Sequence, residues 1–180
     1  MPRPDPVSDR VFRLQHPWSP DGGQNLPKVS DLIPHRPPFL LLKDDYEYWI
    51  TTRDPEPDDK VVVPMDVAAA HSLCGNGHFP NDPIIPGVYI AEAMQQAAAM
   101  LTLFIDRLNF EDKSSWVPPV VVVRDIDISF DCPVRPTDVV MIEVVMDERK
   151  RVSARYHGIS RVGDDVVCTL HRLRGMIAQR

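Results

Sequence analysis

The chain has 180 residues, 43% of them apolar and 26% charged, which is typical of one globular domain with a buried core. The net charge of −6 and an isoelectric point near 5.4 argue against nucleic acid as a partner. The apolar stretch 117–123 is too short to cross a bilayer, and the N-terminus lacks an apolar signal segment. We therefore expect a cytoplasmic protein without a membrane span.

The distribution of cysteines and charges narrows the class further. Cys74, Cys132 and Cys168 are odd in number and widely spaced, which predicts reduced packing residues and no disulfide framework. Residues 149–180 carry eight Lys or Arg against two Asp, so a basic end follows an acidic body. Such an end is typical of a docking surface for an anionic partner, or equally of strands with solvated outer faces.

The first half of the chain predicts an irregular arm and two strands. Residues 1–28 contain six prolines and little hydrophobic periodicity, which predicts an arm ahead of a domain over 29–180. A first strand is predicted from Leu40 toward Ile50, and a second over 60–65.

The second half predicts one long helix followed by β structure. Val88–Ile105 carries alanine, methionine and leucine on all faces, so we expect a helix enclosed on most sides. Its polar residues and modest length argue against a membrane span. Gly163 opens a hairpin turn between the last two strands. This order predicts an α+β fold, an antiparallel sheet curled around the helix. Four strands are predicted after the helix, over 120–130, 139–148, 152–161 and 166–177.

His78 and Glu92 are the candidate acid/base pair. His78 lies in a proline-rich loop, and a histidine titrates near neutral pH, so it can accept a proton from carbon. Glu92 is a carboxylate within an apolar helix, where an unpaired charge costs several kcal/mol. Gly87 opens that helix, where its N–H can polarise a thioester carbonyl. These groups suit proton abstraction beside a carbonyl with loss of a β leaving group.

Each of these residues has a plainer interpretation. His78 is also compatible with a loop histidine bonded to backbone, and Glu92 with a carboxylate that reaches solvent or pairs with an arginine. His71, Cys74 and His78 have a spacing compatible with zinc, but the sequence offers no evident fourth ligand, so we expect no metal.

Three motifs resemble the β-hydroxyacyl-acyl-carrier-protein dehydratases, enzymes of the hot-dog fold. The motifs appear in the family's order and span roughly residues 29–178. Pro37, Cys132 and Thr137 depart from the family's usual residues. The motifs are Leu32-Ile-Pro-His-Arg-Pro-Pro-Phe-Leu-Leu, Gly77-His-Phe-Pro with Pro86-Gly-Val to Glu92-Ala-Met-Gln-Gln, and Cys132-Pro-Val-Arg-Pro-Thr-Asp.

The resemblance implies a hot-dog homodimer, or a dimer of dimers, that acts without a cofactor. Its substrate would be a (3R)-hydroxyacyl chain on the phosphopantetheine of an acyl carrier protein. His78 of one subunit would meet Glu92 of the other, and the Gly87 amide would bind the thioester carbonyl. Phe79, Val88 and Gln96 are further expected substrate contacts. A glutamate at position 92 resembles the dehydratase-only branch.

Other functions stay open at this stage. A hot-dog acyl thioesterase would use Glu92 to activate water or attack the thioester, and would release free thiol. A dehydratase/isomerase, a non-catalytic acyl-carrier module and a specialised polyketide-like dehydratase are further alternatives. Because acyl carrier proteins are typically acidic, the basic end, including Arg149 and Arg151, is a docking hypothesis.

Overall fold

The computed structural model describes residues 26–50, 56–110 and 115–178. Most of the predicted arm, and residues 51–55 of the predicted loop 51–59, lie outside these described residues.

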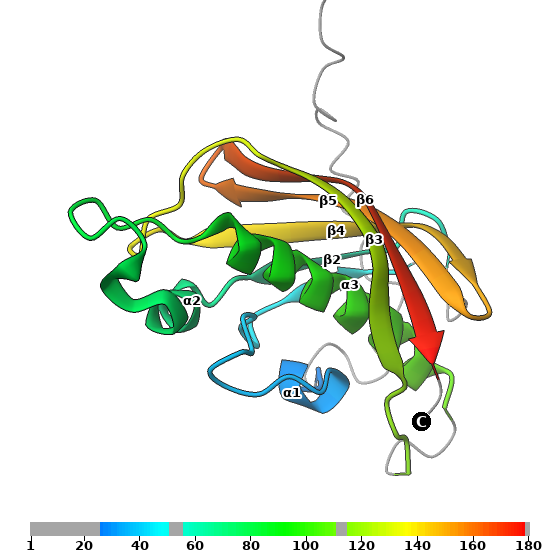
Figure 1. The fold of residues 1–180 in the computed structure, drawn as a ribbon. Helices are drawn as coiled ribbons and strands as arrows, with labels where there is room; N and C mark the ends of the chain where they lie inside the picture. Colours follow the sequence, from blue (N-terminus) through cyan, green and yellow to red (C-terminus); the bar gives the residue numbers. More distant parts are fainter. Residues whose placement is uncertain (1–25, 51–55, 111–114, 179–180) are drawn as a thin grey trace, which may run out of the picture.

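A six-stranded antiparallel sheet forms the body of the fold. The strand order is β1-β2-β4-β5-β6-β3, and the sheet curls around the long helix α3 (Figure 1). The four long strands agree with their predicted positions to within two residues, because runs of β-branched residues form half-buried strands. The strands are β1 (Glu47–Trp49), β2 (Lys60–Pro64), β3 (Val120–Phe130), β4 (Val140–Lys150), β5 (Ser153–Val162) and β6 (Asp165–Ala178).

Helix α3 (Gly87–Leu108) forms the centre of the core, as predicted. It lies against the concave face of the sheet, and α1 (Val29–Leu32) covers it from the other side (Figure 1). By length and composition the helix could cross a membrane, but 72% of its most apolar window is buried inside the protein. The sheet and α1 therefore cover most of its apolar surface.

Two short elements were not predicted. One is α1, and the other is α2 (Val67–Cys74), which begins where the Asp66 side chain accepts a hydrogen bond from the Ala69 N–H at 3.1 Å. An aspartate before three alanines is an N-terminal helix signal. A 3₁₀ turn over Gly75–Gly77 then leads to the His78 loop.

The predicted first strand was wrong in extent. Within residues 40–50 the structure has an isolated bridge between Leu42 and Met65 and the short strand β1. The polar run between them leaves the sheet because Asp44 turns back, and its carboxylate accepts the Val29 N–H at 2.8 Å. This bond fixes the start of α1.

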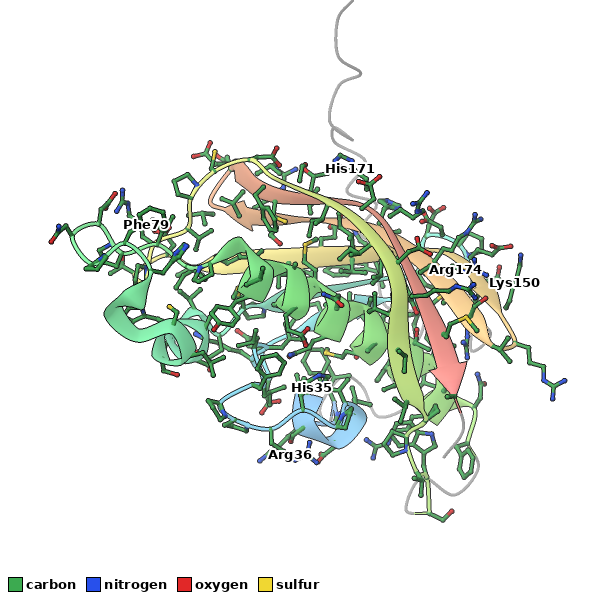
Figure 2. The ribbon with its side chains drawn as sticks, in the orientation of Figure 1. His35, Arg36, Phe79, Lys150, His171 and Arg174 are labelled. Atoms are coloured by element: carbon green, nitrogen blue, oxygen red, sulfur yellow. The ribbon has the colours of Figure 1, made fainter. Side chains whose placement is uncertain are left out.

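Four basic residues of the C-terminal end form ion pairs with acidic groups in the described part of the chain. Arg149, which we expected to be available for docking, is 12% exposed and donates to Asp106 of α3 at 3.0 Å. Burial raises the pKa of Asp106 despite that pairing. Glu148 pairs with both Lys150 and Arg155. The docking hypothesis is therefore wrong for Arg149, because its side chain turns inward to the helix. Lys150 and Arg174 lie on the outer side of the sheet (Figure 2).

The three cysteines are free, as predicted. Cys168 is buried in the core, Cys74 is half-buried, and Cys132 is exposed, so the packing interpretation holds for Cys168 and is wrong for Cys132.

Gly158 of β5 is predicted to be intolerant of a side chain. A Cβ there would lie 2.3 Å from the Glu143 carbonyl oxygen of β4, a backbone atom that cannot move without disturbing the strand pair. Gly158→Ala should lower the free energy of unfolding by about 1–3 kcal/mol, as overpacking does. The control is Gly77→Ala, since a Cβ there meets nothing within 4 Å. Equal urea midpoints for the two variants would contradict this prediction.

Candidate active site

The loop before α3 fixes the tautomer of His78. His78 Nδ1 lies 2.9 Å from the carbonyl oxygen of Ile84. A carbonyl can only accept, so Nδ1 carries the hydrogen and Nε2 is left as the nitrogen that can take a proton. Phe79 follows with a positive φ of 57°, and its ring meets the imidazole edge-on at 4.6 Å. The loop therefore holds a histidine ready to act as a base through Nε2.

Glu92 lies on α3 and is bonded on one oxygen. Its Oε1 accepts from Gln96 Nε2 at 3.0 Å and lies 3.4 Å from His35 Nε2. The side chain is 24% exposed. Burial by itself would raise the pKa of Glu92, but the hydrogen bonds from His35 and Gln96 and the nearby imidazole outweigh it, and the pKa lies below its usual value.

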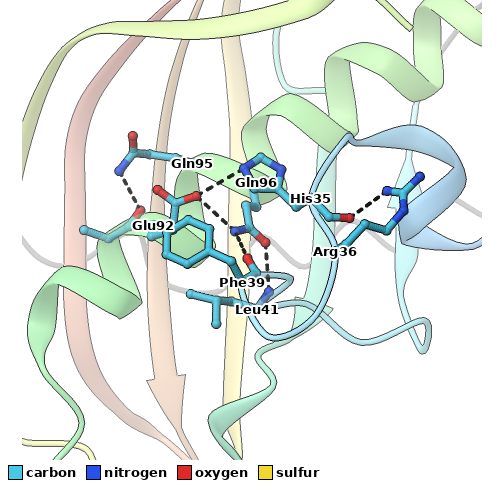
Figure 3. A network of polar contacts seen from close by, with 8 residues as sticks. His35, Arg36, Phe39, Leu41, Glu92, Gln95 and Gln96 are labelled. Carbon is cyan, nitrogen blue, oxygen red and sulfur yellow. Dashed lines mark hydrogen bonds and ion pairs between the residues drawn. The ribbon is translucent and has the colours of Figure 1, made fainter. Parts of the chain in front are cut away.

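Gln96 ties the loop after α1 to the central helix (Figure 3). Its Nε2 donates to the Phe39 carbonyl at 2.9 Å as well as to Glu92, and its Oε1 accepts the Leu41 N–H at 2.9 Å. Both amide hydrogens and the carbonyl are engaged, which settles the orientation of the amide. The side chain is only 1% exposed. It holds the loop and the carboxylate in one network.

Gly87 begins α3 under the ring of Phe130. A Cβ at position 87 would lie 2.8 Å from that ring, so a side chain there would have to displace the half-exposed Phe130 ring. The first N–H groups of a helix have no acceptor within the helix and suit an oxygen ligand. Val88 and Phe79, two further predicted substrate contacts, are both exposed.

The structure does not bring His78 and Glu92 into contact within the described part of one chain; the neighbour of Glu92 there is His35. Phe79, next to His78, lies on the loop at one end of the molecule, whereas His35 lies beneath α3 (Figure 2). The prediction that the pair meets across two subunits stays a prediction.

A cavity of about 260 Å³ adjoins Glu92. It runs between α3 and the inner face of the sheet, and Tyr156, whose hydroxyl is hydrogen-bonded to Thr102 of α3, lies in its wall. Burial raises the pKa of Tyr156 to about 12, so the phenol is neutral. The cavity is lined by His35, Glu92, Gln95, Gln96, Ala98, Ala99, Val121, Val122, Val123, Tyr156, Leu173 and Gly175. A largely apolar space beside a carboxylate suits a hydrocarbon chain.

The metal alternative gains no support. Among the residues that the structure describes, no three His, Cys, Asp or Glu side chains are grouped to hold an ion. Cys74 Sγ instead donates to the His71 carbonyl, and Ile84 engages one nitrogen of His78.

Comparison with known proteins identifies the family. The model of the FabA-like domain matches residues 58–171. The chain belongs to this family. It is 34% identical to the 3-hydroxyacyl-[acyl-carrier-protein] dehydratase FabZ of an Anaeromyxobacter species, over 84% of this chain and 89% of that protein. The resemblance stated from the three motifs is confirmed.

Solved structures confirm the α+β hot-dog fold. The dehydratase heterocomplex ApeI:P from Xenorhabdus doucetiae contains a chain with a TM-score of 0.63 at 15% identity, covering 87% of this chain and 94% of that one. A Lactococcus lactis chain, yhdA, described provisionally as a thioesterase, has a TM-score of 0.57 at 9% identity and covers 78% and 95%. Both reaction classes share the fold, so the fold alone does not decide between them.

His35 is the site residue that sequence reasoning missed. It belongs to the first of the three motifs, where it was noted as part of a pattern and received no role. A histidine within a motif of a matched family is a signal in itself, but its neighbour on α3 is visible only in the fold.

Gln96 should contribute to stability as well as to the site. Gln96→Leu leaves the buried Leu41 N–H without its acceptor, which should cost about 1–3 kcal/mol, and removes the donor to the part-buried Phe39 carbonyl, which should cost less because that group lies nearer solvent. The matched control is Gln95→Leu, because within the described part of the chain Gln95 donates to the Ala91 carbonyl of its own helix and to no other segment. Urea unfolding of both variants measures the difference, and a Gln96 variant as stable as its control would contradict the bridging role.

Proposed function

We propose that this protein dehydrates a (3R)-hydroxyacyl thioester to the trans-2-enoyl thioester in fatty-acid or related lipid synthesis in the cytoplasm. One observation carries the proposal: a FabA-like fold holds both a histidine and a carboxylate suited to proton transfer. Nε2 of His78 is free to accept a proton, and Glu92 is held by a hydrogen bond from Gln96. A relative that is 34% identical is named as a dehydratase of this kind. The enzyme is a hydro-lyase.

The proposed reaction needs a base, an acid and a carbonyl clamp. Nε2 of His78 takes the α-proton while the Gly87 N–H stabilises the enolate oxygen. The electron pair of the broken C–H bond forms the double bond, and the β-hydroxyl leaves with a proton from Glu92 as water. Despite burial, the hydrogen bonds to Glu92 lower its pKa, which favours the carboxylate over the acid. Dehydration starts from the protonated form, because that form carries the proton that leaves with the hydroxyl. The same carboxylate activates water in the reverse direction.

The active unit in this proposal is a homodimer acting on an acyl carrier protein. In this proposal a second chain supplies one of the pair, which is consistent with the absence of contact between His78 and Glu92 in the described part of one chain. The edge strand β3 presents exposed apolar side chains that a second chain would cover, namely Val122, Ile126 and Phe130. The carrier would deliver the acyl chain as a thioester, with the hydrocarbon entering the cavity beside Glu92.

Subunit mixing tests the shared site. His78→Ala and Glu92→Gln should each lower turnover of a 3-hydroxyacyl thioester about a hundredfold or more. Unfolding the two inactive variants together and refolding them should restore about a quarter of wild-type activity, because half the dimers are mixed and each has one intact site. No recovery, with mixed dimers shown by mass spectrometry, would rule out a site built from both chains. Full activity in both single variants would end the dehydratase proposal.

Gly175 should control the acyl length that the cavity accepts. It pairs with Val123 of β3, and a Cβ there would lie 3.2 Å from Val121 and 3.8 Å from Tyr156, all lining residues. Gly175→Leu should therefore fill the cavity. We expect kcat/KM to fall about tenfold or more for a hydroxydodecanoyl thioester and little for hydroxybutyryl, since a removed binding contact costs about 1–3 kcal/mol.

Gly175→Ala is the matched control for that substitution, because it adds one methyl group at the same position and should change the length preference only slightly. An equal loss of kcat/KM for short and long substrates in Gly175→Leu would indicate damage to the fold. It would contradict the prediction that the cavity sets the accepted acyl length.

A further inference from the structure

The loop between α1 and β1 places His35 beside Glu92 of α3. Arg36 Nη1 donates to the carbonyls of Ile33 at 3.0 Å and His35 at 2.7 Å, which fixes the backbone on both sides of the histidine. The Phe39 ring stacks on the imidazole with centroids 6.2 Å apart. Phe39 is itself tied to α3 through Gln96. Arg36 therefore fixes the backbone around His35, and the Phe39 ring packs on its imidazole.

The surroundings of His35 determine which nitrogen carries its hydrogen. Nδ1 is buried and, among the described residues, has no hydrogen-bond partner. An N–H there would be an unsatisfied buried donor, at a cost of about 1–3 kcal/mol, whereas a bare lone pair costs less. Nε2 faces the Glu92 carboxylate at 3.4 Å. The hydrogen of the neutral imidazole consequently belongs on Nε2, the nitrogen that lies near Oε1.

The two donors converge on a single carboxylate oxygen. Gln96 Nε2 and His35 Nε2 both address Oε1 of Glu92, from α3 itself and from the loop that packs on it (Figure 3). Gln95, the other amide nearby, donates to the Ala91 carbonyl instead. Within the described residues Oε2 receives no hydrogen bond. One oxygen is thus anchored and the other is left for the reacting group.

We propose that His35 is a positioning residue for the reaction: by donating to Oε1 of Glu92, it turns Oε2 toward the β-hydroxyl of the substrate. This inference rests on the proposed dehydratase function and adds a third side chain to it. Fixing the carboxylate in a reactive orientation should raise the catalytic rate strongly, because a misplacement of about 1 Å can lower that rate about a hundredfold.

The orientation and the pKa of the Glu92 carboxyl affect different features of the pH–rate profile. The titratable groups facing Glu92 are His35 from the loop, Tyr156 across the cavity and, in the proposed dimer, His78 of the partner subunit. Removing the donor at position 35 takes away an influence that lowers the pKa of Glu92, so that pKa rises. Dehydration needs the protonated carboxyl, so its rate declines with rising pH, and the midpoint of that decline moves up. The loss of orientation lowers the plateau of kcat.

The experiment compares His35→Leu, His35→Gln and a matched control. Leucine removes the donor, whereas glutamine places an amide N–H near the position of Nε2. The control is His71→Leu on α2, since His71 also has a buried Nδ1 without a partner among the described residues, but does not line the cavity. The measurements are kcat and KM for a hydroxybutyryl thioester across pH, with thermal unfolding of each variant.

We expect His35→Leu to lose about ten- to a hundredfold in the kcat plateau, with its midpoint at higher pH and KM little changed. His35→Gln should recover most of the plateau, and His71→Leu should match wild type. A His35→Leu plateau and midpoint equal to wild type would overturn the proposal, and so would a loss that glutamine does not restore. A wild-type protein that fails to dehydrate any 3-hydroxyacyl thioester would overturn the proposed function itself.

Discussion

The amide of Gln96 is the interaction on which the site depends. A buried amide stabilises the fold only when its donors and acceptor are all paired, because an unsatisfied polar group in the core costs about 1–3 kcal/mol. Gln96 meets that requirement by joining the loop backbone at Phe39 and Leu41 to the carboxylate of Glu92. Core packing and catalytic geometry therefore share one side chain. Removing this amide should therefore weaken both the packing of the loop on α3 and the orientation of the Glu92 carboxylate.

The position of Glu92 is a balance between burial and hydrogen bonding. An apolar helix enclosed by a curled sheet raises the pKa of a carboxylate, yet the donors from His35 and Gln96 reverse the direction. Among the described residues, this carboxylate at the wall of the cavity has an imidazole and an amide as its polar neighbours, and no arginine or lysine forms an ion pair with it. Such a group can exchange a proton with a substrate, whereas one locked in a tight ion pair, like Asp106 with Arg149, serves the fold.

The sequence predicted the long elements and the short strand β2 well, and the other short elements poorly. Helix α3 and strands β3 to β6 follow from sustained runs of one residue class, where local preference and burial agree. The predicted strand over 40–50 was wrong in extent because the carboxylate of Asp44 bonds to the distant Val29 N–H, a contact that no local pattern reports. Helix α2 was missed although Asp66 before three alanines is a helix signal. Arg149 was expected on the surface, and only packing against Asp106 turned it inward.

By itself, the sequence determined the family, the fold class and the chemical types at the site: a histidine in a loop, a carboxylate on an apolar helix and a glycine at the helix start. Only the tertiary structure decided which nitrogen of His78 is basic, which oxygen of Glu92 is anchored, and that His35 stands beside it. The physical reason is distance along the chain. Hydrogen-bond direction depends on partners such as Phe39 and Gln96, which are separated by 57 residues and meet only when the sheet closes around the helix.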